Sequence, residues 1–331
     1  MKKIYSALKY LLLLSLAGIL LWFSFKGVKW SDFLNGIKDT NYWWILASMA
    51  ISILAFFVRA VRGRMIMQTL GKPVKLRDSW DGVNIGYLTN FAAPRAGELA
   101  RCGVIAKKSG IPVESVVGSV VLERSIDLLS LIILVILVVF LSWEQFGTFI
   151  NKEILGALPG KFSSNLILLA SVIILAFAIF IYIVFKYRER HPIFKKIVKI
   201  TKGLFDGLVS GFRMKQKWLF ILLTILLWTC YWLMSLTTIY AFPKVGFLGA
   251  TDALFLMVVG SLGWLIPVQG GIGAFHFVTT LALAQVYGIS QTTGIVFATI
   301  SHESQALTMI ICGTLSLVSF SLSKRKKEVV K

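Results

Sequence analysis

Six apolar runs, each of about 20 residues or more, constrain the fold of this chain more than any other feature of its sequence. About 20 apolar residues carry an α-helix across the hydrocarbon core of a bilayer, and inside lipid a helix satisfies its own backbone hydrogen bonds. The sequence therefore predicts an all-α polytopic membrane protein with about six transmembrane helices. The runs cover residues 4–25, 42–61, 116–141, 166–185, 218–242 and 293–322.

The first run has two interpretations, because a basic start precedes it. It fits either a cleavable signal peptide or a retained first helix. The run continues to Phe25 and is followed by Lys26, with no small-x-small cleavage site, and this favours the retained helix. The longest hydrophilic stretch, residues 186–217, is too short to bury a core of its own. We therefore expect a single membrane domain.

Positive charge follows the ends of the apolar runs. If the N-terminus lies in the cytoplasm, the cytoplasmic segments hold 26 of the 35 Lys and Arg residues, as the positive-inside rule requires. This count assigns the six basic residues from Arg59 to Arg77 to an inner loop. The net charge of +20 is then explained by the orientation of the chain in the membrane. It fits contact with anionic lipid headgroups better than binding of nucleic acid. Both termini are predicted to be cytoplasmic.

Two regions between the runs, residues 80–106 and 253–286, are interrupted by Pro and Gly. In the predicted orientation each region enters and leaves the membrane on one face. Residues 80–106 are too few for two spans, so they predict a re-entrant helical hairpin that turns near residues 93–97. Residues 253–286 fit either a second re-entrant hairpin or two short spans.

Each half of the chain thus consists of two helices, a hairpin and a third helix. Three crossings is an odd number, so the halves are predicted to be inverted repeats, an architecture typical of alternating-access transporters. A Gly-Ile pair at 110–111 precedes Glu123 by thirteen residues, as a second pair at 288–289 precedes Ser301. The predicted repeats are residues 1–141 and 142–331.

Polar side chains lie in or beside the broken segments, at membrane depth. An ionisable group there costs at least about 2.5 to 3.5 kcal/mol, so such residues usually mark a functional site. The planar fork of arginine suits phosphate, and the carboxylates would hold the arginines or bind a cationic headgroup or a proton. The candidate substrate-binding residues are Asn90, Arg95, Glu98, Arg101, Glu123, Arg124, Asp127, Gln269, Gly270, Gly271, His276, His302 and Glu303.

Structural interpretations stay open for several of these residues. Asn90 can cap a half-helix. The two histidines can join neighbouring helices by hydrogen bonds or can carry protons. The charged residues nearly balance, so they can also pair as buried salt bridges without a ligand. The cations are Arg95, Arg101 and Arg124, and the anions are Glu98, Glu123, Asp127 and Glu303.

Motifs for metals and cofactors are absent from the sequence. Residues 302–306, HESQA, resemble the zinc protease motif, but Ala306 stands in place of its second histidine. The three cysteines, at 102, 230 and 312, lie far apart in apolar surroundings and form no metal motif. We expect neither a metal nor a cofactor.

Three motifs together resemble the lysylphosphatidylglycerol synthase transmembrane, or flippase-like, family over nearly the whole chain. They are NFAAPRAGELAR at 90–101, ERSID at 123–127 and PVQGG at 267–271. The family includes the membrane half of the bacterial multiple peptide resistance factor, which moves aminoacylated phosphatidylglycerol between leaflets, and stand-alone relatives associated with polyprenyl-linked sugars. The sequence holds no soluble aminoacyl-transfer domain, so the resemblance implies lipid translocation in a bacterial cytoplasmic (inner) membrane rather than synthesis.

The expected function is therefore that of a lipid flippase, not an enzyme, that admits a phosphate-bearing headgroup to a polar cavity. Its expected partners are membrane lipids with anionic headgroups. The chain has no ATPase motif, so transport would be facilitated or coupled to an ion gradient. Two alternatives stay open: a membrane enzyme acting on a lipid-linked substrate, and a scaffold that assists lipid-modifying enzymes. The candidate proton carriers are Glu98, Glu123, Asp127, His276 and His302.

Overall fold

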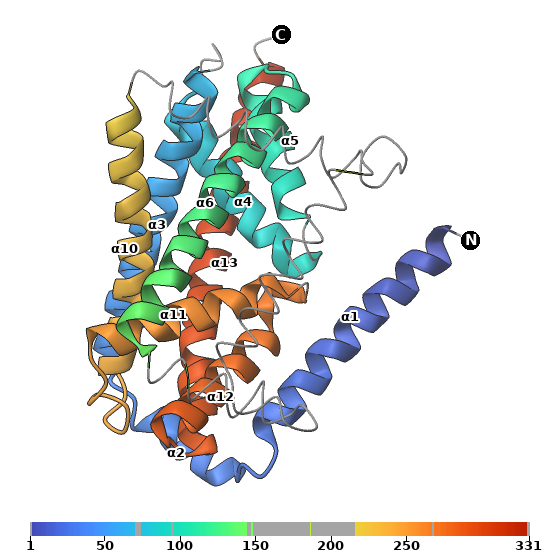
Figure 1. The fold of residues 1–331 in the computed structure, drawn as a ribbon. Helices are drawn as coiled ribbons and strands as arrows, with labels where there is room; N and C mark the ends of the chain where they lie inside the picture. Colours follow the sequence, from blue (N-terminus) through green and yellow to red (C-terminus); the bar gives the residue numbers. More distant parts are fainter. Residues whose placement is uncertain are drawn as a thin grey trace.

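The computed structural model describes residues 2–69, 74–93, 96–143, 147, 186, 216–266 and 268–329. All regular structure in these residues is helical, which confirms the predicted all-α class. The predicted span at 166–185 lies outside the described residues. The elements in Figure 1 are α1 (Lys2–Phe25), α2 (Trp30–Lys38), α3 (Tyr42–Thr69), α4 (Leu76–Ala92), α5 (Gly97–Ser109), α6 (Val113–Leu141), α10 (Lys217–Tyr240), α11 (Ala250–Leu265), the 3-10 helix η3 (Gln269–Gly271), α12 (Ala274–Tyr287) and α13 (Gln291–Val329).

Four helices in the described part of the chain, α3, α6, α10 and α13, are long and apolar enough to cross a membrane. A fifth span results if Leu11–Phe25 of α1 and the short helix α2, which meet at 85°, are counted as one bent unit. Helix α6 turns large apolar side chains outward, with Phe140 78% exposed and Ile133 56% exposed. Such a surface fits lipid rather than water. The chain is a polytopic membrane protein.

Helix α2 is an element that the apolar runs do not predict, because it has only 9 residues and they are amphipathic. Gly27, with φ of 79°, makes the turn that precedes it. The buried Phe33 packs on Phe25 of α1, with the ring centroids 5.2 Å apart. On α2, Gly36 leaves room for Val296 of α13, since an added Cβ would lie 2.9 Å from that side chain. Helix α2 therefore links the end of α1 to the beginning of α13.

Helices α4 and α5 form the first hairpin. They have 17 and 13 residues, or about 26 and 20 Å, and each is shorter than the roughly 30 Å hydrocarbon core. The chain leaves the helical conformation at Ala93, where φ is −144° and ψ is 118°. Their backbones approach closely, because an added Cβ at Gly86 would lie 2.9 Å from the carbonyl oxygen of Gly97. At the open end, Lys108 forms ion pairs with Asp78 and Asp81.

Helix α11, η3 and α12 form the second hairpin. The break between its helices uses glycines in the left-handed region, with φ of 55° at Gly270, 78° at Gly271 and 83° at Gly273. At the open end, the Tyr287 hydroxyl donates a hydrogen bond of 2.9 Å to Asp252. The same carboxylate accepts a hydrogen bond from the backbone N–H of Gly249 at the beginning of α11.

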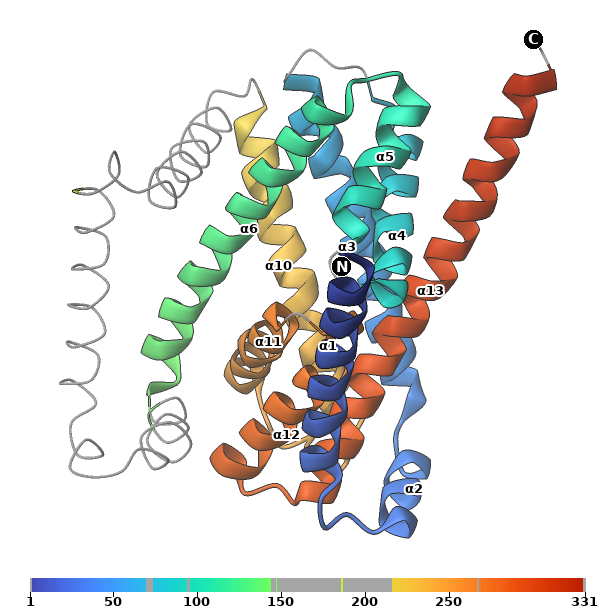
Figure 2. The same ribbon diagram turned by 90° about the vertical axis from the view of Figure 1, so that its right-hand side faces the viewer.

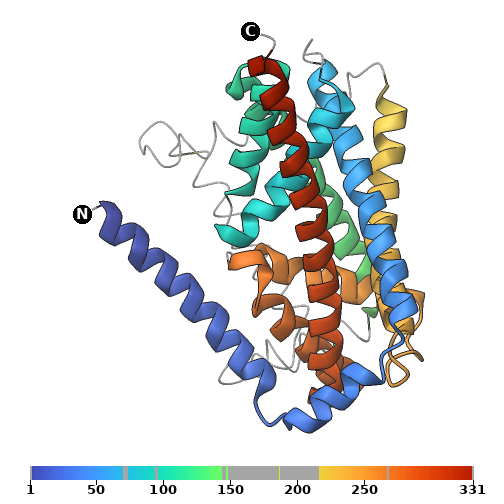
Figure 3. The ribbon, with the colours of Figure 1, turned by 180° about the vertical axis from the view of Figure 1, so that it is seen from behind.

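The two hairpins open toward opposite faces of the bundle. The first opens at the face where α13 ends, and the second opens at the face where α2 lies (Figures 1 and 3). Both lie between α6 and α13 (Figure 2): α6 contacts α5 and α11, and α13 contacts α4 and α12. The tips meet inside the bundle, where an added Cβ at Gly270 would lie 2.7 Å from the ring of Phe91 at the end of α4.

Candidate functional site

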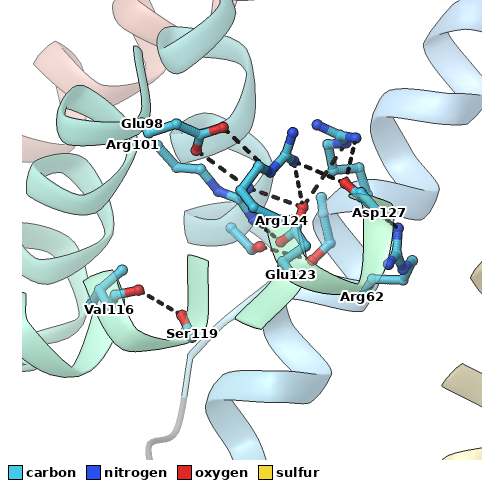
Figure 4. Close-up of polar contacts among 11 residues, drawn as sticks. Arg62, Glu98, Arg101, Val116, Ser119, Glu123, Arg124 and Asp127 are labelled. Carbon is cyan, nitrogen blue, oxygen red and sulfur yellow. Dashed lines mark hydrogen bonds and ion pairs between the residues drawn. The ribbon is translucent and has the colours of Figure 1, made fainter. Parts of the chain in front are cut away.

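A cluster of arginines and carboxylates lies where α3, α5 and α6 meet (Figure 4). At its centre, Arg101 of α5 donates two hydrogen bonds to Glu123 of α6, Nη1 to Oε1 at 3.1 Å and Nη2 to Oε2 at 2.6 Å. The two side chains are only 4% and 1% exposed. A bidentate pair of this kind fixes the orientation of both groups. It joins the first hairpin to α6.

Asp127, one helical turn after Glu123, binds two arginines of α3. Its carboxylate accepts hydrogen bonds from Arg59 Nη2 at 3.0 Å and from Arg62 Nη1 at 2.9 Å. Arg124 lies beside both acids, with its Nη2 3.0 Å from Glu123 Oε1 and 3.3 Å from Asp127 Oδ2. Residues of three helices thus form one continuous ion-pair network.

Arg59 and Arg62 belong to this network and not to an inner basic loop, which corrects the assignment made from the charge count. Helix α3 continues to Thr69, eight residues beyond the predicted end of the apolar run, so both side chains lie on a helix rather than in a loop. Arg62 is fully buried. The three-residue spacing of the two arginines, at the end of an apolar run, places both on one helix face and is a sequence signal that could have identified them.

A small pocket of about 230 Å³ opens beside this cluster. The Nε atoms of Arg59 and Arg101, both of which line it, are buried and have no hydrogen-bond partner. The guanidinium of Arg59 also lies over the ring of Tyr87, 5.9 Å from its centroid. The pocket therefore lies beside two arginines that each keep one buried N–H without a hydrogen bond. It is lined by Arg59, Val83, Gly86, Tyr87, Asn90, Gly97, Glu98 and Arg101.

Asn90 has the capping role that its sequence position left open. Its side-chain oxygen accepts a hydrogen bond of 2.8 Å from the backbone N–H of Gly97, so it caps the N-terminus of α5. It also lines the pocket. Glu98 lines the pocket as well and pairs with Arg124 at 3.5 Å. Arg95 lies outside the described residues.

Charge in the cluster is not balanced. Four guanidinium groups face three carboxylates in the part of the network that the structure describes, which leaves one positive charge. The excess lies next to a pocket and to the positive N-terminal end of α5. This arrangement can bind an anion. The groups are Arg59, Arg62, Arg101 and Arg124 against Glu98, Glu123 and Asp127.

A second polar cluster joins α13 to the tip of the second hairpin. His302 Nε2 lies 2.8 Å from the carbonyl oxygen of Gly270, and His302 Nδ1 lies 2.9 Å from Glu303 Oε1. His276 of α12 lies 3.9 Å from the same carboxylate oxygen. The ring of Trp264 stacks on His302, with centroids 5.2 Å apart. Both histidines are buried, whereas the Glu303 side chain is 54% exposed.

The geometry of this second cluster fits hydrogen bonding. Two ligands about 2.1 Å from a tetrahedral zinc ion stand roughly 3.4 Å apart. The separation of 2.9 Å between His302 Nδ1 and Glu303 is shorter and is typical of an N–H···O hydrogen bond.

The structure divides the predicted site residues between these two clusters. Glu303, which the charge count grouped with the arginines, instead pairs with His302. Gly270 supplies its carbonyl oxygen to the second cluster. Gln269 and Gly271 lie in η3 beside it, with Gln269 half-buried and Gly271 buried. The tip contact between Gly270 and Phe91 connects the two clusters.

The chain matches the family model described as "Lysylphosphatidylglycerol synthase TM region" over residues 8–313. The match covers most of the 331 residues and includes both polar clusters. No curated protein and no solved structure matches the chain.

Proposed function

Because the chain belongs to the lysylphosphatidylglycerol synthase TM region family, we propose that it moves a phosphate-bearing lipid between the two leaflets of a membrane. The headgroup binds at the arginine pocket, and the acyl or prenyl chains stay in the bilayer. The lipid is an aminoacyl phospholipid or a polyprenyl-phosphate-linked lipid, since both present a phosphate to the same guanidinium groups.

The excess of one positive charge among the described residues of the cluster carries this proposal. A buried ion-pair network that served only to join helices would gain little from an unpaired charge, because an uncompensated charge is costly in a medium of low dielectric constant. A phosphate neutralises it. Arg59 and Arg101, which line the pocket, would lie beside such a ligand.

The carboxylates have a positioning role in this proposal. Both carboxylate oxygens of Glu123 accept hydrogen bonds from Arg101, and the Asp127 carboxylate accepts hydrogen bonds from Arg59 and Arg62. Arginines fixed in this way lose little conformational freedom when they bind a headgroup, and preorganised donors bind an anion more tightly than flexible ones.

The hairpins suggest how the site is reached from each side. We propose that the two halves of the chain are inverted repeats and that each hairpin controls access from the face at which it opens. Matching helix ends support the equivalence of the halves: α5 ends at Gly110 with φ of 66° and ψ of 23°, and α12 ends at Gly288 with φ of 64° and ψ of 19°. In both halves the next helix begins three residues later.

The proposed location follows from the same charge distribution. We place the protein in a bacterial cytoplasmic membrane with both termini in the cytoplasm, because this orientation keeps most Lys and Arg residues on the inner side. The first hairpin then opens toward the cytoplasm.

Leaflet-selective quenching of a fluorescent phosphatidylglycerol in vesicles that contain the purified protein tests the proposal. We expect Arg59→Ala to slow the protein-dependent exchange about tenfold or more, since a charge-assisted hydrogen bond contributes about 1.5 to 3 kcal/mol. Lys38→Ala removes an exposed positive charge on α2 and is the matched control. Unchanged exchange in a folded double variant, Arg59→Ala with Arg124→Ala, would overturn the site assignment.

Mass spectrometry of the same vesicles separates transport from chemistry. A translocated lipid keeps its covalent structure, so we expect the lipid masses before and after the assay to be identical. A new lipid product that forms only with the protein present would instead favour a membrane enzyme. No lipid exchange and no product would leave a scaffold as the better explanation.

A further inference from the structure

His302 lies between two hydrogen-bond acceptors. One is the carbonyl oxygen of Gly270, 2.8 Å from Nε2, and the other is the Glu303 carboxylate, 2.9 Å from Nδ1. A carbonyl oxygen can only accept, and an ionised carboxylate can only accept. A neutral imidazole has one N–H, so it can donate to one of these groups but not to both. Both contacts are satisfied only when the pair holds one additional proton.

We propose that His302 and Glu303 form a proton-binding site that locks the tip of the second hairpin to α13. A hydronium ion transfers its proton to the ring nitrogen that lacks one, which forms a second N–H bond on the ring and leaves a water molecule. His302 then donates from Nε2 to Gly270 and from Nδ1 to Glu303. The half-exposed Glu303 carboxylate gives the proton a route to the fully buried ring.

Few charged groups surround this pair. His276 of α12 faces the Glu303 carboxylate at 3.9 Å, and its Nδ1 is buried without a hydrogen-bond partner. Helix α11 contributes the apolar ring of Trp264 at this point, and η3 contributes the backbone of Gly270. Within the described residues, no arginine or lysine lies within ion-pair distance of Glu303. Among the described residues, a proton on His302 is therefore the positive charge nearest to the Glu303 carboxylate.

Loss of the proton releases the hairpin. If His302 keeps the hydrogen on Nε2, the lone pair of Nδ1 faces the carboxylate at 2.9 Å, and the two acceptors repel each other. If the hydrogen moves to Nδ1, the bond to the Gly270 carbonyl is lost. Either state weakens a contact that the protonated state makes. The two states thus differ in how firmly α13 holds the hairpin tip.

The hairpin tip connects this site to the arginine pocket. Gly270 packs against Phe91, and Phe91 follows Asn90 and Tyr87 of the pocket on α4. The three acidic candidate proton carriers near the arginines, Glu98, Glu123 and Asp127, are less suitable, because each pairs with at least two arginines. The proton site itself is independent of what the protein transports. Its use in driving transport rests on the proposed function.

Nitrogen-15 NMR of the imidazoles in the full chain, reconstituted in lipid nanodiscs, tests the proton site. The chain has three histidines, so His276→Gln and His302→Gln assign the signals. We expect His302 to give the signals of an imidazolium, with both ring nitrogens protonated, in the native protein. In Glu303→Gln we expect one protonated ring nitrogen at the same pH. A neutral His302 in the native protein from pH 5 to pH 8 (roughly the range in which histidine titrates) would overturn the proposal.

Cysteine labelling at the hairpin tip tests the lock. Gln269→Cys places a thiol in η3, and Ser290→Cys places a reference thiol in the exposed loop after α12, while the three native cysteines are buried. Relative to the reference thiol, we expect Glu303→Gln to raise the labelling rate at position 269 about tenfold, because a hydrogen bond to a charged group is lost. An unchanged ratio would overturn the lock.

Two further results keep this proposal separate from the proposed function. Zinc that copurifies in a one-to-one ratio and disappears in His302→Gln would assign the site to a metal and overturn the proton assignment. Absence of lipid exchange in vesicles, together with the expected NMR and labelling results, would reject the transport function and leave the proton site standing.

Discussion

Gly63 of α3 lies directly against the guanidinium group of Arg101 of α5. A Cβ at this position would clash with Arg101 Nη2 and would lie 3.2 Å from Glu123 Oε2. The absence of a side chain at residue 63 therefore allows Arg101 to reach Glu123. An arginine tip can normally swing away from a new methyl group, but this one is buried and held by two hydrogen bonds.

Gly63→Ala should accordingly displace Arg101 and weaken its pair with Glu123. We expect about 1.5 to 3 kcal/mol of lost stability, the contribution of hydrogen bonds between charged groups, and a slower lipid exchange. Thermal unfolding in detergent and the vesicle assay measure the two effects. Gly103→Ala is the control, because an added Cβ there meets no atom within 4 Å, and we expect its stability to be unchanged or slightly higher. Equal effects of the two substitutions would contradict the steric argument.

Removal of one partner of the Arg101–Glu123 pair should lower the free energy of unfolding more than removal of both partners. Arg101→Met or Glu123→Leu alone leaves a buried charge with too few partners, and such changes cost about 3 to 5 kcal/mol. In the double variant the two losses of stability should not add. Each single variant leaves one charged member of the pair buried without the other, whereas the double variant removes both members. Denaturant unfolding of the four proteins measures the coupling. If the costs add, the two side chains do not interact in the native state.

The same double variant separates folding from function. An apolar pair of similar volume can replace a buried ion pair and keep the fold. Because a guanidinium proposed to bind phosphate is gone, we expect lipid exchange to stay low even where stability is regained. Exchange that recovered together with stability would favour the interpretation of the cluster as a structural clamp.

The sequence predicts the long helices well, because a run of apolar residues of sufficient length has few alternatives in lipid. It also predicts the break near residue 93, since Pro and Gly interrupt the helix there. The end of α3 is predicted poorly: the apolar run ends near Arg59 and Arg62, yet the helix continues, and both arginines pair with Asp127. A hydropathy window cannot detect a partner that lies more than sixty residues away in the chain.

The sequence likewise does not show which of the candidate site residues pair with one another. The spacing of Glu123, Arg124 and Asp127 places these residues near one another on a helix, but the arginines that bind Asp127 depend on how α3 packs against α6. For the same reason Glu303 could be counted with the arginines until the structure placed it beside His302. Composition identifies which residues are costly at membrane depth, and tertiary packing decides which of them meet.

Asp127→Asn should destabilise the protein far more than Glu98→Gln. Asp127 is 12% exposed and binds Arg59 and the fully buried Arg62. Its neutralisation removes the ion-pair partner of Arg62 and leaves Arg59 with the longer contact of 3.9 Å to Glu123. We expect Asp127→Asn to lower the free energy of unfolding by about 3 to 5 kcal/mol. Glu98 is 41% exposed, and we expect its pairs with Arg101 and Arg124 to contribute less than about 1 kcal/mol. Denaturant unfolding of both variants checks the order, and similar losses would mean that burial does not determine the strength of these pairs.

Gly270→Ala should separate the two hairpin tips. The new methyl group would lie 2.7 Å from the ring of Phe91, and alanine at a φ of 55° adds about 1 to 2 kcal/mol of backbone strain. The clash moves η3 away from α4, so we expect exchange of the fluorescent lipid to fall and labelling of Gln269→Cys to rise. Phe91→Ala in the same chain removes the clash but not the strain. It should therefore restore exchange in part and stability less. If Phe91→Ala gives no recovery, the strain at residue 270 alone accounts for the defect, and contact between the tips does not couple the hairpins.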